Sequence, residues 1–146
     1  MIRQRALRKD DIPAIMGFKK KSVRVSFPGH EFSPEKFRES LERHMEKEPE
    51  GIQVLEEDGK IIGYIWFSSG NGDVGEYGLL RQLFVDEEYR GKGLAERLIR
   101  YAEEYFFAKG IKRIKLTVTM SNSPAIRLYE KLKYDKTRVV MEKTVE

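Results

Sequence analysis

Residues 77–119 constrain the fold more than any other part of the chain. Residues 77–85 have the composition of a strand, and residues 94–108 carry apolar side chains at helical spacing. Gly110 follows as an expected left-handed helix end, and residues 114–119 alternate apolar and polar side chains. A strand, a helix and a second strand in this order predict a right-handed parallel crossover.

The N-terminal third predicts one strand and two helices. Asp10 or Asp11 can cap the first helix, and Ser33, followed by Pro34, can cap the second. The expected strand spans residues 2–7, the helices end near residues 25 and 47, and the break between them is Phe27-Pro28-Gly29-His30.

A hairpin is expected next. Asp58-Gly59 is a strong two-residue turn signal, and it lies between predicted strands at 52–56 and 60–68. Residues 70–75 match the pattern G-x-G-x-x-G, but a strand follows them where dinucleotide binding requires a helix. We therefore interpret residues 70–75 as a hairpin loop.

The end of the chain predicts one more helix and one more strand. Pro124 opens a helix that runs to about residue 133, and residues 138–144 read as a final strand. The expected fold is α/β with a mixed sheet, in the order β-α-α-β-β-β-α-β-α-β. We expect a single domain over residues 1–146, because no repeat or long linker interrupts the sequence.

Composition narrows the possible chemistry. The absence of cysteine excludes disulfides, thiolate metal sites and a cysteine nucleophile. His30 and His44 have no companions in a metal-binding pattern, so we expect surface histidines and no metal. The longest apolar runs, such as 61–67, are too short to span a membrane, and the N-terminus has no apolar leader segment. A cytoplasmic protein is expected.

The net charge of +4 is unevenly distributed. Residues 1–30 hold eight basic and two acidic residues, whereas residues 31–58 hold ten acidic and four basic residues. The run Lys19-Lys20-Lys21 could contact nucleic acid, but no aromatic residues are interleaved with it, so we favour a solvated helix face. The acidic segment could attract a cationic substrate, and a charged helix face explains it equally well.

The turn between the strand and the helix of the crossover has the features of a phosphate site. The strand ends at Val85, and the helix begins within Arg90-Gly91-Lys92-Gly93-Leu94-Ala95. A helix N-terminus offers unpaired N–H donors, the two glycines let a ligand approach the backbone, and the two cations add positive charge. The pattern fails as a P-loop, because Gly93 follows Lys92 where Ser or Thr is required.

Two motifs together resemble the GNAT superfamily of N-acetyltransferases. The first is R-x-x-G-x-[GA] at Arg90, Gly93 and Ala95, after an L-x-V strand end at Leu83 and Val85. The second is the segment 122–134, Asn-Ser-Pro-Ala-Ile-Arg-Leu-Tyr-Glu-Lys-Leu-Lys-Tyr, which is similar to the family's N-x-x-A-x-x-L-Y-x-K-L-G-F. The resemblance covers essentially the whole chain and is weakest before residue 50.

The resemblance implies a site for acetyl-CoA where the two parallel strands of the crossover splay apart. It implies that Leu83, Phe84 and Val85 face the pantetheine and the thioester, and that residues 90–95 (Arg90, Gly91, Lys92, Gly93, Leu94, Ala95) hold the pyrophosphate. It further implies that Asn122 and Ala125 line the cofactor and that Tyr129 lies near its sulfur. The implied partners are acetyl-CoA and an amine.

Two catalytic candidates follow from the implied reaction. Tyr129 is the expected general acid for the departing thiolate, and its alternative is a packed aromatic beside Leu128 and Leu132. Glu76 is the candidate general base for the amine, and a solvated carboxylate near Asp73 is an equally good reading.

One position departs from the family pattern. Lys133 stands where the family has a glycine, so we expect the last helix to end without the usual left-handed turn.

Three functions compete. The first is acetyl transfer to a protein, peptide or small-molecule amine. The second is a non-catalytic acyl-CoA-binding or regulatory module, of which a homodimer is one form. The third, a basic nucleic-acid-binding domain, is the least favoured.

Overall fold

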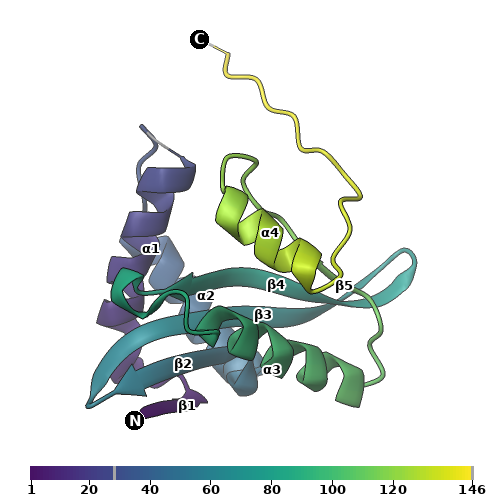
Figure 1. The fold of residues 1–146 in the computed structure, drawn as a ribbon. Helices are drawn as coiled ribbons and strands as arrows, with labels where there is room; N and C mark the ends of the chain where they lie inside the picture. The colour runs from purple at the N-terminus through teal and green to yellow at the C-terminus, as the bar shows by residue number, and fades with distance from the viewer. Residues whose placement is uncertain (28, 146) are drawn as a thin grey trace.

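The computed structural model describes residues 1–27 and 29–145, and its centre is a five-stranded sheet (Figure 1). The strands follow one another in space in chain order, β1-β2-β3-β4-β5. Their bounds are β1 Ile2–Ala6, β2 Ile52–Glu57, β3 Lys60–Gly72, β4 Gly75–Val85 and β5 Ile114–Leu116. The first four strands pair antiparallel and β4 pairs parallel with β5, so the expected mixed sheet is confirmed.

Helices cover both faces of the sheet (Figure 1). They are α1 Ile12–Ser26, α2 Pro34–Lys47, α3 Leu94–Ala108 and α4 Ser123–Lys131, with short 3-10 turns at Lys9–Asp11, Pro49–Gly51 and Glu87–Tyr89. On β3, Trp66 belongs to a core cluster with α1 and α2, and its neighbour Phe67 belongs to a cluster with α3 and α4. Alternation along one strand therefore separates two cores.

Both hairpins form, and the second is tighter than expected. Asp58 and Gly59 have φ of 50° and 80°, as a two-residue turn between right-twisted strands requires. The loop expected at residues 70–75 is wrong in extent, because Gly72 and Gly75 still pair and only two residues turn the chain. A Cβ on Gly70 would lie 2.5 Å from the Tyr77 ring, so cross-strand packing accounts for that glycine.

The two N-terminal helices start differently from each other. The Ser33 side chain accepts a hydrogen bond from the Lys36 N–H, which confirms the predicted cap of α2. Asp11 precedes α1, but the expected side-chain cap is wrong. The Asp11 carboxylate instead accepts from the Arg8 N–H at 2.8 Å, and from the Arg5 guanidinium in two hydrogen bonds of 2.7 and 3.0 Å. Pro28, in the predicted break, lies outside the described residues.

The last helix ends in the turn that its sequence argues against. Lys133 has φ of 74°, the Tyr134 N–H donates to the Tyr129 carbonyl, and the Lys133 N–H donates to the Glu130 carbonyl. These bonds define a Schellman motif, so the expectation of a different helix end is wrong. The motif satisfies the last carbonyls of α4 although lysine replaces glycine.

The strand expected at residues 138–144 is also wrong, because those residues have no regular secondary structure. Val139, Val140 and Met141 are 77%, 70% and 89% exposed, and no described strand lies beside them. A β-strand is held by its partner, so strand-like composition alone does not form one. The strand predicted at 114–119 is similarly shortened to β5, Ile114–Leu116.

Candidate functional site

The crossover strands β4 and β5 separate partway along their length. They pair only at Gly78–Ile114, Leu79–Lys115 and Leu80–Leu116. Beyond Leu80, β4 continues to Val85 and stays paired with β3 on its other side. No described strand pairs with residues 81–85 on the β5 side, so that edge is open to an extended ligand, except at the Val85 carbonyl, which accepts from the Arg90 Nε.

A β-bulge marks the point where the strands part. Trp66 pairs with Gln82 and Phe67 pairs with Leu80, so Arg81 is the extra residue on β4. Such bulges bend a strand and redirect its side chains. The Arg81 guanidinium lies 4.9 Å from the centre of the Trp66 ring, on the face covered by α1 and α2.

Two further residues at the bulge were missed by sequence reasoning. The Tyr64 hydroxyl donates to the Gln82 side-chain oxygen at 2.6 Å. Tyr64 is 1% exposed, and burial raises its pKa well above the usual range, so the hydroxyl stays protonated. The sequence signal that could have indicated this pair is Gln82, a polar residue within the otherwise apolar end of β4.

The turn after β4 has the backbone geometry of an anion site. Gly91 and Gly93 have φ of 78° and 79°, and a Cβ built on either would have no atom within 4 Å. Packing therefore does not require these glycines, whereas the backbone conformation does. Gly93 is the N-cap of α3 and has no side chain, so no N-cap side chain pairs with the N–H groups of the first helical turn.

The two cations of the turn are held by its aromatic residues. The Arg90 Nε donates to the Val85 carbonyl at 2.9 Å, and its guanidinium lies 5.7 Å from the Phe84 ring. The Lys92 ammonium lies 5.2 Å from the Tyr89 ring. The Arg90 side chain thus folds back onto the end of β4, whereas Lys92 lies over the 3-10 turn Glu87–Tyr89.

A hollow of about 460 Å³ reaches the same helix start. It lies between α3 and β1 and is lined by Gln4, Gly93, Glu96, Arg97, Arg100, Tyr101 and Glu104. Glu96, the acidic residue of the first turn, is paired with Arg100 at 3.2 Å and with Lys131 of α4 at 3.1 Å. These cations compensate the charge of Glu96 close to the start of α3.

Helix α4 brings the second motif onto the α3 side of the sheet. The Asn122 side chain accepts from the Ala125 N–H at 3.4 Å, so it caps α4. Tyr129 is half-buried in the cluster that contains Leu94 of α3, and burial raises the pKa of Tyr129 to about 12. Its hydroxyl therefore carries a proton throughout the neutral range.

Glu76 is not brought together with the turn. It pairs with Asn71 at the start of β4, is exposed, and lies at the opposite end of that strand from Val85. Nine residue steps of extended chain lead from Glu76 to Val85, which corresponds to about 30 Å.

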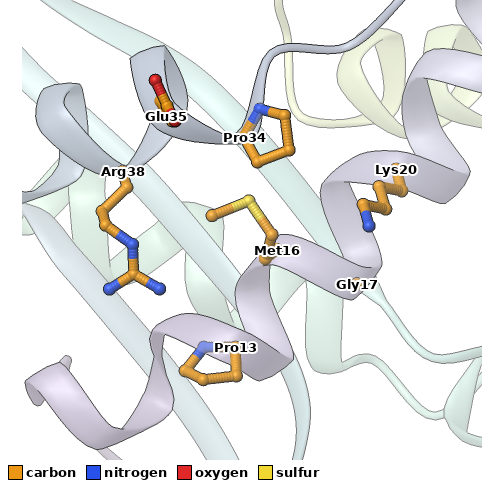
Figure 2. Close-up of a pocket in the computed structure, with 7 residues that line it drawn as sticks. All are labelled: Pro13, Met16, Gly17, Lys20, Pro34, Glu35 and Arg38. Carbon is orange, nitrogen blue, oxygen red and sulfur yellow. The ribbon is translucent and has the colours of Figure 1, made fainter.

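A second hollow lies between α1 and α2 (Figure 2). Its volume is about 350 Å³, and Met16 lies between two prolines on its floor while Lys20 and Arg38 flank it. The lining residues are Pro13, Met16, Gly17, Lys20, Pro34, Glu35 and Arg38. It belongs to the N-terminal helices and does not include the turn after β4.

One of the two histidines is not at the surface. His30 is exposed, but the His44 side chain is 11% exposed and packs edge-on against Trp66, with ring centroids 5.5 Å apart. Burial lowers the pKa of His44. Among the described residues there is no group of three or more potential metal ligands, and no helix is long and apolar enough to cross a membrane.

Comparison with known proteins identifies one family. The model of the "Acetyltransferase (GNAT) family" matches residues 20–134. An uncharacterized N-acetyltransferase of Methanocaldococcus jannaschii is 32% identical over 101 residues, which are 66% of this chain and 44% of that protein. An acetyltransferase of Sodalis glossinidius is 35% identical over 95 residues, covering 65% of this chain and 64% of that protein. The matches thus span less than two thirds of these relatives.

The fold itself recurs in solved structures. A predicted acetyltransferase of Clostridium acetobutylicum, crystallised with acetyl-CoA, superimposes with a TM-score of 0.79 over 99% of this chain and 96% of that one. Sequence identity is 16%, so this likeness concerns the fold alone.

Proposed function

Because this chain belongs to the acetyltransferase (GNAT) family, we propose that it moves the acetyl group of acetyl-CoA to a primary amine, by direct attack in a ternary complex. The observation that carries the proposal is the continuity of the open edge of β4, at residues 81–85, with the glycine turn at the start of α3. One feature suits an extended chain with amide groups, and the other suits a phosphate.

The open edge of β4 would hold the pantetheine. The backbone groups of Leu83 and the Val85 N–H lie on the edge away from β3 and can exchange hydrogen bonds with the ligand's amides as a neighbouring strand would. The backbone of Phe84 pairs with β3, and the Val85 carbonyl already accepts from the Arg90 Nε. A backbone N–H directed at the thioester oxygen favours the charge that develops there, and one such donor contributes about 3 kcal/mol.

The start of α3 would hold the pyrophosphate. Unpaired N–H groups at Leu94 and Ala95 and the positive end of the helix attract an anion, and the bare backbone of Gly91 and Gly93 leaves room for it. Arg90 and Lys92 add charge beside the turn, although both lie over aromatic rings. Asn122 and Ala125, at the start of α4, would line the ligand's other side.

Tyr129 would supply the proton that the departing thiolate requires. A group with a pKa of about 12 is protonated at neutral pH, so the hydroxyl can donate but cannot act as a base. Glu76 as general base stays a prediction, and its place at the far end of β4 gives that role no support. We assign no other base.

The acceptor is proposed only as a primary amine, of a small molecule or of a peptide. The proposal is tested by measuring the CoA thiol that is released from acetyl-CoA in the presence of each member of a panel of amines. The panel contains polyamines, amino acids, aminoglycosides and peptides. Amine-dependent release supports it. Calorimetric binding of acetyl-CoA without release for any amine would favour the non-catalytic acyl-CoA-binding module, and absence of binding would remove both functions.

A further inference from the structure

The face of the sheet that packs against α1 and α2 is open over β5 and over the first half of β4. Among the described residues of these two strands, only Phe84 belongs to the buried cluster of α1 and α2. Three exposed cations lie on the open part of this face: Arg81 of β4, Lys115 of β5, and Arg113 directly before β5. We call these three residues the basic patch.

Lys115 and Arg113 point to this face together. Ile114 and Leu116 belong to the cluster of α3 and α4, so strand alternation turns Lys115 to the opposite side of the sheet. The Arg113 guanidinium and the Lys115 ammonium lie 5.7 and 3.9 Å from the centre of the Tyr77 ring. The two cations therefore form one group around Tyr77.

Arg81 extends the basic patch to the point where β4 and β5 part. Its guanidinium lies over Trp66, which faces α1 and α2. Leu79 pairs with Lys115, so Arg81 lies two residues, or about 7 Å, further along the sheet, and Arg113 lies about as far in the other direction. Within the described part of the chain, no carboxylate forms an ion pair with any of the three cations. The basic patch is thus an uncompensated row of positive charge.

We propose that the amine acceptor is a peptide with acidic residues close to its free amine, and that the basic patch binds those residues; this rests on the proposed acetyl transfer. The proposed acetyl-CoA site uses the starts of α3 and α4, which pack on the other face of the sheet. The amine therefore reaches the thioester from the face that carries the basic patch. Negative charge on the acceptor complements the patch and draws the acceptor to that face.

The spacing of the three cations suits an extended peptide. Alternate residues of an extended chain place their side chains on one side about every 7 Å, which matches the two-residue steps between the cations. With its amine level with Leu83, an extended peptide that runs antiparallel to β4 brings its third, fifth and seventh residues beside Arg81, Lys115 and Arg113 in turn. Carboxylates at these positions would each meet one cation.

The surroundings of Tyr77 favour a peptide over a nucleic acid. Single-stranded nucleic acids bind by stacking their bases on open aromatic rings beside cations. A Cβ on Gly70 would lie 2.5 Å from the Tyr77 ring, so the ring packs against Gly70 of β3, while Lys115 of β5 lies over it. The ring is engaged by its own neighbours, which disfavours stacking on a base.

Peptide binding in the presence of CoA, measured by calorimetry, tests the proposed site without acetyl transfer. The probe is a heptapeptide that begins with alanine and carries glutamate at its third, fifth and seventh positions, and its uncharged twin carries glutamine there. We expect the acidic peptide to bind at least about 10-fold more tightly at low salt. The difference should shrink at about 0.5 M salt, because salt screens exposed charges.

Charge removal shows whether the basic patch causes this preference. The triple variant Arg81→Gln/Arg113→Gln/Lys115→Gln should bring the two affinities within about 2-fold of each other. The double variant Arg113→Gln/Lys115→Gln keeps Arg81 at the bulge, so it serves if the triple variant does not fold, and it should reduce the preference at least about 3-fold. Lys36→Gln is the matched control, because Lys36 is exposed in the first turn of α2, and it should keep the preference of the wild type.

Equal binding of the two peptides by the wild type, or a preference that persists in both patch variants, would overturn the proposed acidic-peptide site. Tighter, patch-dependent binding of a single-stranded oligonucleotide of equal charge would also overturn it, in favour of a nucleic acid. Thiol release separates this outcome from the proposed function. Charge-dependent peptide binding without release for any acceptor would refute acetyl transfer and keep the patch as an acidic-peptide site, whereas amine-dependent release with no charge preference would refute the patch and keep acetyl transfer.

Discussion

The ring of Tyr134 meets the ring of Tyr129 edge to face, with centroids 5.7 Å apart, across the end of α4. This is the apolar contact that accompanies a Schellman motif, between the residue after the left-handed turn and the third residue from the helix end. The Tyr134 hydroxyl also donates to Glu103 of α3 at 2.8 Å. The contact orders the helix turn that carries the proposed proton donor.

Lys133→Gly should stabilise the protein. Lys133 occupies the left-handed region at φ of 74°, where a Cβ costs about 1 kcal/mol relative to glycine. We expect the free energy of unfolding, measured in urea, to rise by about that amount, with Lys136→Gly in the exposed segment as an unchanged control. A loss of stability in Lys133→Gly would show that the lysine side chain makes a compensating contact.

Gly93→Asp should weaken acetyl-CoA binding far more than Gly93→Asn does. Asn and Asp both tolerate φ of 79° and have the same shape, so the pair isolates one negative charge at the helix start. A like charge about 4 Å from a phosphate costs several kcal/mol at an effective dielectric constant of about 20. We expect at least a ~10-fold difference in calorimetric affinity between the two variants. Equal affinities would place the pyrophosphate elsewhere.

Tyr129→Phe should lower turnover with little change in acetyl-CoA affinity. Loss of a positioned proton donor costs about 10²-fold or more in rate, while the ring keeps its contact with Tyr134. Because the pKa of Tyr129 is raised to about 12, turnover in the wild type should show no alkaline loss from this group up to about pH 10. Steady-state kinetics from pH 7 to 10 give both results, and equal turnover in the variant would remove the proposed role.

Glu48 should make the fold sensitive to acid. Burial disfavours its charged form, but hydrogen bonds from the Ser69 N–H and from the Tyr105 and Ser69 hydroxyls outweigh burial and lower the pKa of Glu48. The unfolded chain therefore binds this proton more tightly than the folded chain. The stabilisation is complete above the unfolded pKa of about 4.3 and is lost as pH falls through the lower folded value.

The matched variants are Glu48→Gln and, at an exposed site two residues earlier in the last turn of α2, Glu46→Gln. Urea unfolding should show Glu48→Gln less stable by about 1–2 kcal/mol at pH 7, with the difference from wild type shrinking in acid. Glu46→Gln should follow the wild type at both pH values. A Glu48→Gln deficit that stays constant with pH would mean that packing, and not charge, sets its cost.

Local chemistry in the sequence determined most of the elements. Four features depend only on residues close to them in the chain. They are the bounds of α3, the left-handed Gly110, the Asp58-Gly59 turn and the Ser33 cap. Such features depend on neighbours in the chain, so periodicity and turn residues suffice to predict them. The glycine turn after β4 belongs to the same class, and its geometry agrees with the prediction.

Tertiary structure decided the features that depend on distant partners. The composition of residues 138–144 resembles a strand, but no strand among the described residues pairs with it. Glu76 and Val85 share a strand, yet their separation along it keeps the carboxylate away from the turn. Lys133 takes the left-handed turn because two backbone hydrogen bonds and the Tyr129–Tyr134 contact outweigh its strain. The sequence alone predicted the glycine turn, whereas the open edge of β4 that leads to it exists only because β5 stops pairing at Leu116.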